Sequence, residues 1–335
     1  MVLDTITGTV KRLRHSKNMQ STNRQNSAAH LSLEAKSSAA NDLLLSGFAL
    51  TALGLFHILV WLILGGEWEG PVSWRKPILF GVSTGLTLLS IGYFFDRLIP
   101  SNSDPWLIRI LSIALVAEVS LITIQQWRGQ ASHFNHDSTI NTWIEYSMTI
   151  LIVLATLILL QITYRTFSYL NMATDLQFSI RAGMAFLIIS CVIGFFVLWN
   201  GNQQMQAGAD PSTFGKAGVT KFPHGIAIHS LQFFPCLCFL FAKLGLNMKE
   251  RMRSLQFLVA WMSGLLGFSL IQTLTGNARF QWTFAGACLF AISTLFLLPV
   301  IWLVSRTLLN NVFEMLDNRR LNGQSVEKRQ STEGR

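Results

Sequence analysis

Long apolar runs separated by short polar connections recur along the whole chain. Each run approaches or exceeds the roughly 20 residues with which an α-helix crosses a hydrocarbon core, and is far longer than a strand of a membrane barrel. The pattern predicts an all-α fold, a polytopic bundle of eight transmembrane helices. The predicted spans lie at about 43–65, 76–98, 106–126, 141–163, 179–199, 224–246, 255–276 and 281–305.

Composition agrees with a protein that lies within a membrane. Charged residues make up 13% of the chain and apolar types 50%, whereas a soluble domain carries about 25% charged residues. The formal charge of +9 comes from basic residues scattered between the apolar runs, not from one basic domain. We therefore expect the lipid bilayer as the partner, and no nucleic acid.

The two ends of the chain differ from the apolar middle. Residues 1–41 are polar and lack the apolar core of a secretory signal, so we expect a disordered cytoplasmic tail. Residues 42–306 form the predicted eight-helix domain, and 307–335 a second cytoplasmic tail. All four cysteines fall inside apolar runs, where a thiol behaves as a small apolar group and not as half of a structural disulfide.

Basic residues predict the orientation. Most of the 26 Lys and Arg lie on the side that holds both tails and the even-numbered connections, including the short cluster Lys243, Lys249, Arg251 and Arg253. Cytoplasmic loops carry such an excess of positive charge. We therefore expect an inner (plasma) membrane protein with both termini in the cytoplasm.

A few strongly polar side chains lie within the spans. Counting from the extracytoplasmic ends at about 1.5 Å per residue puts His57, Glu118, Glu145 and His229 in one layer, roughly 7 to 12 Å deep. Facing lipid, each would cost at least about 2.5 kcal/mol at the bilayer centre, so we expect them to face the interior. Charged groups at the cytoplasmic ends are expected to snorkel to the interface. The pattern predicts a His/Glu pocket toward the extracytoplasmic side.

The two glutamates are the candidate catalytic residues. Buried acids inside membranes mark proton, ion or substrate paths, although Glu118 and Glu145 are also readable as neutral acids bonded to neighbours. Gln125 and Gln126 follow Glu118 by seven and eight residues and share its helical face. On the sixth span His229 and Gln232 lie one turn apart, before a kink expected at Pro235. The three glutamines are candidate ligand-binding residues.

The histidines allow two metal hypotheses. His133 and His136, with His224 on the same predicted side, have the donor chemistry of a metal site to which Asp137 could add a ligand. Alternatively His57 and His229 are axial ligands of a haem. The competing interpretation is ordinary hydrogen bonding in loops and between helices.

Two further features border the predicted pocket. Arg75, Lys76 and Arg128 are candidates for an anion-binding patch, or else they contact lipid phosphates beside an interfacial tryptophan belt. The connection at 200–223 is long and rich in Gly, Gln and Asn. It is either a lid or a passive solvated loop.

Three strings of the sequence are similar to a set of bacterial multi-span membrane proteins of uncharacterised function. They are Trp74-Arg75-Lys76-Pro77, Arg128-Gly129 with Ser132-His133-Phe134-Asn135, and His224-Gly225 with His229 and Gln232. The resemblance covers most of the spans and implies no activity. It implies that the three strings form one site. The predicted topology suggests the same, because it puts all three on the extracytoplasmic side of the membrane.

Three functions remain open from the sequence. The first is a pocket that binds a metal, haem or small polar ligand and supports redox chemistry on a lipid-soluble substrate. The second is a proton-coupled transporter in which Glu118 and Glu145 carry protons. The third is a noncatalytic sensor or assembly factor whose buried polar groups specify packing.

Overall fold

The computed structural model describes residues 38–313 and residue 315, so most of the two predicted tails lies outside the described residues. Eight helices are long and apolar enough to cross a membrane, and each coincides with one predicted span. The all-α polytopic fold is therefore confirmed. The helices are Ser38–Leu64, α2 Arg75–Phe95, α3 Asp104–Trp127, α4 Thr139–Ser168, α5 Thr174–Gln206, Lys221–Lys243, α8 Met248–Leu274 and Phe284–Phe313.

Two of these spans are subdivided. The sixth consists of α6 Lys221–Ala227 and α7 Ser230–Lys243, and the eighth begins with α9 Phe284–Leu295. The sixth span breaks at Ile228 and His229, ahead of Pro235, which lies inside α7. Proline lacks an N–H and crowds the carbonyl four residues earlier, which here is Leu231 inside α7, so Pro235 does not explain the break at Ile228 and His229.

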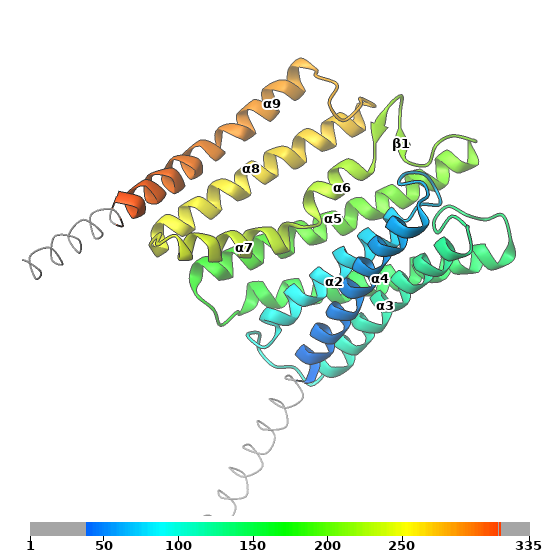
Figure 1. Cartoon of the computed structure of the whole chain (residues 1–335), viewed down its shortest axis with the longest axis horizontal. Helices are drawn as coiled ribbons and strands as arrows, with labels where there is room; N and C mark the ends of the chain where they lie inside the picture. Colours follow the sequence, from blue (N-terminus) through cyan, green and yellow to red (C-terminus); the bar gives the residue numbers. More distant parts are fainter. Residues whose placement is uncertain (1–37, 314, 316–335) are drawn as a thin grey trace, which may run out of the picture. The chain divides into compact units, whose positions relative to one another are not determined.

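The described residues form two compact units, divided between Leu170 and Asn171. In the first unit the helix Ser38–Leu64, α2, α3 and α4 run alternately up and down (Figure 1). Its interior consists of large apolar side chains, among them Leu88, Phe95 and Ile122, while Ile63, Ile113 and Ile150 are exposed. An apolar outer surface is expected where lipid replaces water as the solvent.

Glycines bring the first helix close to α2. A Cβ placed on Gly81 would lie 2.8 Å from the Cα of Gly54, and a Cβ placed on Gly85 would lie 2.7 Å from the backbone oxygen of Gly47. Small residues let membrane helices approach closely enough for their backbones to touch. The absence of side chains at these positions therefore sets the spacing between the two helices.

A buried ion pair ties α3 to α4 at the end where α3 begins. Arg165 donates to both carboxylate oxygens of Asp104, at 2.6 and 3.0 Å, and to the backbone oxygen of Ile99 at 2.6 Å. Asp104 is only 1% exposed. Asp104 is therefore neutralised within the protein, by its partner Arg165.

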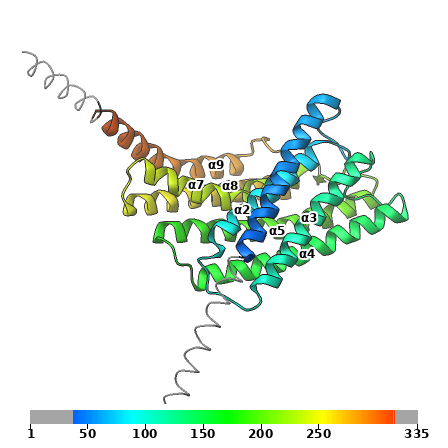
Figure 2. The ribbon, with the colours of Figure 1, turned by 60° about the horizontal axis from the view of Figure 1, so that its bottom comes forward.

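In the second unit α8 lies beside both α7 and α9, and α5 packs against α7 (Figure 2). The same kind of ion pair recurs where α5 and α8 begin. Arg251 Nε donates to Asp175 at 2.5 Å, and the thiol of Cys238 lies 3.4 Å from the same carboxylate oxygen. All four cysteines are unbridged, as expected of thiols in apolar surroundings.

The connection between α5 and α6 is shorter and more ordered than predicted. Helix α5 continues to Gln206, and β1 Thr213–Phe214 pairs with β2 Gly218–Val219 in an antiparallel hairpin. Asn200 donates to the Thr213 carbonyl at 2.7 Å, and the Thr273 hydroxyl donates to the Val219 carbonyl at 3.0 Å. These bonds anchor the hairpin to α5 and α8.

Candidate functional site

His57 lies in an aromatic cluster of the first unit. Its ring stacks on Trp74 at 6.0 Å between centroids, and the two indoles of Trp74 and Trp127 meet edge to face at 5.1 Å. The His57 side chain is buried, with 1% exposed. The cluster joins the first helix, α2 and α3.

Both ring nitrogens of His57 have partners. Nδ1 lies 2.8 Å from the Leu53 carbonyl, which only accepts, and Nε2 lies 3.1 Å from Trp127 Nε1–H, which only donates. The partners therefore specify the neutral ring with its hydrogen on Nδ1. This arrangement favours the interhelical hydrogen bond over the haem-ligand interpretation of His57.

A group of amides connects the end of α3 to the start of α4. Gln125 donates to the Asn141 side chain at 3.2 Å and to the Ala131 carbonyl at 3.3 Å. Arg128 donates to Gln125 at 2.5 Å and to Asn141 at 3.3 Å. Gln125 and Arg128, both candidates from the sequence, thus contact each other, whereas Gln126 makes none of these bonds.

Glu145 organises the connection between α3 and α4. Its carboxylate accepts a 2.8 Å hydrogen bond from the backbone N–H of Asn135, and His136 Nε2 lies 3.6 Å from the same oxygen. Phe134 has a φ of 60°, in the left-handed region that non-glycine residues seldom adopt. The buried acid holds this turn, which favours a positioning role over proton carriage.

Lys76 links the start of α2 to the same connection. Its Nζ donates to the Pro71 carbonyl at 2.6 Å and to the Ser132 hydroxyl at 3.3 Å. Ser132 Oγ lies 2.9 Å from His133 Nδ1, and the His133 ring stacks on Phe80 at 5.8 Å. Two of the three resembling strings therefore meet.

Arg75 and Arg128 do not share these contacts. Arg75 pairs at 3.0 Å with Glu69, whose side chain is 78% exposed, and such exposed pairs contribute little to stability. Arg128 is bound by neutral amides. The structure therefore gives the anion patch of Arg75, Lys76 and Arg128 no direct support.

Glu118 differs from the other buried acids. It lies on α3 about two turns before Gln125 on the same face, and it is 5% exposed. Within the described part of the chain, its Oε2 atom has no hydrogen-bond partner. An unpartnered carboxyl oxygen in a buried position is costly, since the lost hydration is not replaced.

His224, His229 and Gln232 belong to the second unit. His224 Nδ1 lies 2.9 Å from the backbone oxygen and 3.0 Å from the hydroxyl of Ser190 on α5. A Cβ on Gly194 would lie 3.5 Å from the His224 ring, an ordinary van der Waals contact. Sequence reasoning missed Ser190, because nothing in its neighbourhood along the chain points to His224, 34 residues away. His229 is exposed at the start of α7, and Gln232 is half-buried one turn later.

The metal hypotheses gain no support. Among residues 38–313 no three His, Cys, Asp or Glu side chains gather as a metal site. Each hypothesis also combines residues of both units, since His57, His133 and His136 belong to the first, and His224 and His229 to the second.

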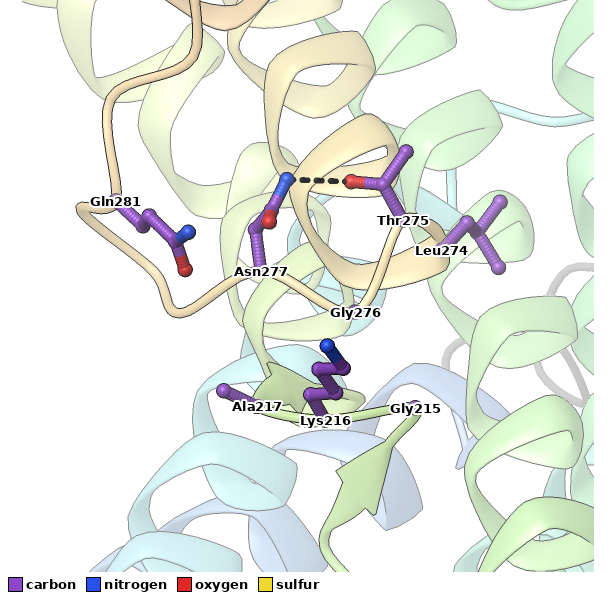
Figure 3. Close-up of a pocket in the computed structure, with 8 residues that line it drawn as sticks. All are labelled: Gly215, Lys216, Ala217, Leu274, Thr275, Gly276, Asn277 and Gln281. Atoms are coloured by element: carbon purple, nitrogen blue, oxygen red, sulfur yellow. Dashed lines mark hydrogen bonds between the residues drawn. The ribbon is translucent and has the colours of Figure 1, made fainter.

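The second unit contains a cavity that the sequence did not indicate. About 460 Å³ in volume, it lies between the hairpin turn at Gly215–Ala217 and the start of the α8–α9 connection (Figure 3). Asn277 donates to the Thr275 hydroxyl at 2.8 Å on its rim. Lys216 is its only charged lining residue, and the predicted site residues take no part in it.

No protein family model, curated protein or solved structure matches this chain. The resemblance to uncharacterised bacterial membrane proteins therefore stays a prediction. Among the predicted site residues, Glu118 has the most unusual surroundings, because it is a buried acid with an unpartnered carboxyl oxygen.

Proposed function

We propose that this multi-pass membrane protein is a proton-coupled transporter of a small solute, and that Glu118 takes up and releases the coupling proton. The observation that carries the proposal is the buried Oε2 atom of Glu118, which lacks a hydrogen-bond partner among the described residues. An acid inside a membrane span is costly, and proteins retain such groups where protons or ions pass.

Comparison with the other buried acids supports this assignment. Asp104 and Asp175 each bind an arginine, and Glu145 accepts the Asn135 N–H. These three have packing roles that explain their burial. Glu118 has no such explanation, because one of its oxygens is left without a donor.

The next polar group on the face of Glu118 is Gln125, and buried Ile122 lies between them on α3. Gln125 lies two turns away on the same face, and beyond it Arg128 and Asn141 reach the α3–α4 connection. At about 1.5 Å per residue, Gln125 lies roughly 10 Å along the helix from Glu118, and polar residues inside membrane spans tend to mark the paths of protons and ions. This arrangement supports proton access from that end of the helix.

The alternatives have less support. Redox chemistry through a bound metal or haem requires ligands, yet both nitrogens of His57 are hydrogen-bonded. Glu145 acts as a positioning residue in the proposal, not as a second carrier. A noncatalytic sensor or assembly factor would have no need of an ionisable group at position 118, and a glutamine there would serve it equally well.

Infrared difference spectroscopy of the purified protein tests the first step. Acidification that stays above about pH 6, where exposed carboxylates remain ionised, should produce the C=O stretch of a protonated carboxylic acid, and Glu118→Gln should remove that band. Glu67→Gln, in the exposed connection before α2, is the matched control and should resemble wild type. An identical spectrum for Glu118→Gln and wild type would refute the proposal.

Transport itself is tested in everted membrane vesicles that maintain a pH gradient. Small amines, organic acids and inorganic cations are added in turn, and dissipation of the gradient is followed with a fluorescent dye. We expect at least one class to dissipate the gradient with wild type and with Glu67→Gln, but not with Glu118→Gln. Equal dissipation with all three proteins would argue against coupling through Glu118.

A further inference from the structure

A groove of about 510 Å³ lies in the second unit at the starts of α5 and α8. This is the end of α8 opposite to the cavity beside the hairpin. Cationic and apolar side chains both contribute to its lining. The lining residues are Thr174, Met248, Lys249, Met252, Arg253 and Gln256.

The cations of the groove differ from their neighbour Arg251. The Arg251 guanidinium is neutralised by Asp175 at 2.5 Å and also donates to the Leu246 carbonyl at 2.9 Å. Lys249 and Arg253 are exposed, and within residues 38–313 neither has a carboxylate within 4.0 Å. Two positive charges therefore lie side by side without a neutralising group among these residues.

Nearby Glu250 does not neutralise them. Its carboxylate accepts the backbone N–H of Asn247 at 3.0 Å, while the Asn247 side chain accepts the Glu250 N–H. This capping box uses the acid to start α8. The only acid in the first turn of α8 is thus held at the helix end.

Helical spacing gives the groove a continuous stripe. Lys249 and Arg253 are four residues apart, as are Met248 and Met252, so all four project from adjoining parts of one helix surface. Lys249 and Arg253 precede the predicted apolar span, which starts at about residue 255, by roughly 9 and 3 Å at about 1.5 Å per residue. The headgroup region borders the hydrocarbon core at this level.

We infer that this groove binds an anionic phospholipid. Lys249 and Arg253 contact the phosphate oxygens, and Met248 and Met252 pack against the adjoining glycerol and upper acyl chains. Basic pockets between membrane helices recognise anionic headgroups in this way, because phosphate supplies the countercharge and the lipid tail covers the apolar lining. The inference is independent of proton coupling through Glu118.

Native mass spectrometry of the detergent-purified full chain tests the inference. The protein is mixed with phosphatidylglycerol, with phosphatidylcholine or with inorganic phosphate. We expect one phosphatidylglycerol to bind more tightly than phosphatidylcholine. At about 1 kcal/mol for each cation near the headgroup, Lys249→Gln/Arg253→Gln should weaken binding of that lipid roughly 30-fold.

The control removes the same charge from the same end of the unit. Lys243→Gln/Arg306→Gln alters the last residue of α7 and a residue near the end of the final helix, outside the groove. This variant should bind phosphatidylglycerol within a factor of two or three of wild type. Thermal unfolding in neutral detergent checks that all variants are folded, and the single variant Arg253→Gln replaces the double variant if that one unfolds.

Three results would overturn the inference. Equal binding of phosphatidylglycerol and phosphatidylcholine would exclude recognition of an anionic headgroup. An equal loss of binding in the control variant would indicate general surface charge. Displacement of the lipid by inorganic phosphate at comparable concentration would identify a soluble anion, not a phospholipid, as the ligand.

Discussion

The indole N–H of Trp127 donates to Nε2 of His57 across 3.1 Å and so joins α3 to the first helix. The indole can only donate, so it fixes which nitrogen of the imidazole carries the hydrogen. A histidine that looks like a metal ligand in the sequence is therefore a hydrogen-bond acceptor between two helices.

Replacing Trp127 with Phe should destabilise the first unit. The ring and most of its packing remain, but His57 Nε2 loses its donor, and interhelical hydrogen bonds in membranes contribute about 0.6 to 2 kcal/mol. Thermal unfolding in detergent measures the change. Trp143→Phe, at a 68% exposed position, should have little effect. A Soret band that disappears in His57→Ala would contradict this role.

Glu145→Ala should open the connection between α3 and α4. The Asn135 N–H would be buried without an acceptor, which costs about 1–3 kcal/mol. Hydrogen exchange of the segment 131–137 should become faster. Glu145→Gln retains a carbonyl oxygen and should have a smaller effect, and Asp137→Ala, at an exposed position, should exchange like wild type. Unchanged exchange in Glu145→Ala would assign the carboxyl a different role.

Gly81→Ala should separate the first helix from α2. The new Cβ would lie 2.8 Å from the Cα of Gly54, and backbone cannot yield as a flexible side chain can. Overpacking of this kind costs about 1–3 kcal/mol, detectable as a lower unfolding temperature. Gly225→Ala, which meets nothing within 4 Å, should be tolerated. Equal stability of the two variants would argue against tight glycine packing.

The turn before the hairpin should lose protection in acid. The backbone N–H of Ser212, at 2.8 Å, and its hydroxyl, at 2.7 Å, donate to Asp210 and hold the pKa of that carboxyl below its usual value. The stabilisation is complete above the ordinary pKa of about 3.9 and is lost as pH falls through the lower folded value. In that pH range the hydrogen exchange of the Ser212 backbone amide should become faster relative to its intrinsic rate at the same pH. Asp210→Asn should remove this pH dependence.

Orientation in the membrane is tested by cysteine labelling. In a chain whose native cysteines are replaced by alanine or serine, Asp137→Cys should react with an impermeant thiol reagent in intact cells. Asn171→Cys, on the opposite side, should react only after permeabilisation. The reverse result would invert the orientation and place both termini outside the cytoplasm.

Helix number follows from the sequence because a membrane span must be long and apolar. The first and last residues of each helix are predicted less well from the sequence. Helix α5 was expected at about 179–199 but extends from Thr174 to Gln206. Its polar last turns remain helical since a helix satisfies its own backbone whatever the surroundings. Hydropathy marks the hydrocarbon core, not the end of a helix.

Burial of Glu118 and Gln125 on one face of α3 could be predicted because both belong to one helix, whose period is known. Hydrogen-bond and ion-pair partners from distant segments of the chain could not be predicted in this way. Asp104 and Arg165 are 61 residues apart, and nothing in either neighbourhood indicates the other. The Trp127 donor of His57 is likewise 70 residues away. The hydrogen-bond interpretation of His57 therefore gained its support only when this tertiary neighbour was known.

The two buried ion pairs impose an order on biosynthesis. Asp104 leaves the ribosome 61 residues before Arg165, and Asp175 76 residues before Arg251. Until its arginine emerges, each aspartate must stay hydrated at the bilayer surface, because an isolated carboxylate is excluded from hydrocarbon. We therefore expect α3 to pack into its unit only after α4 has been inserted, and α5 only after the first residues of α8 have been synthesised.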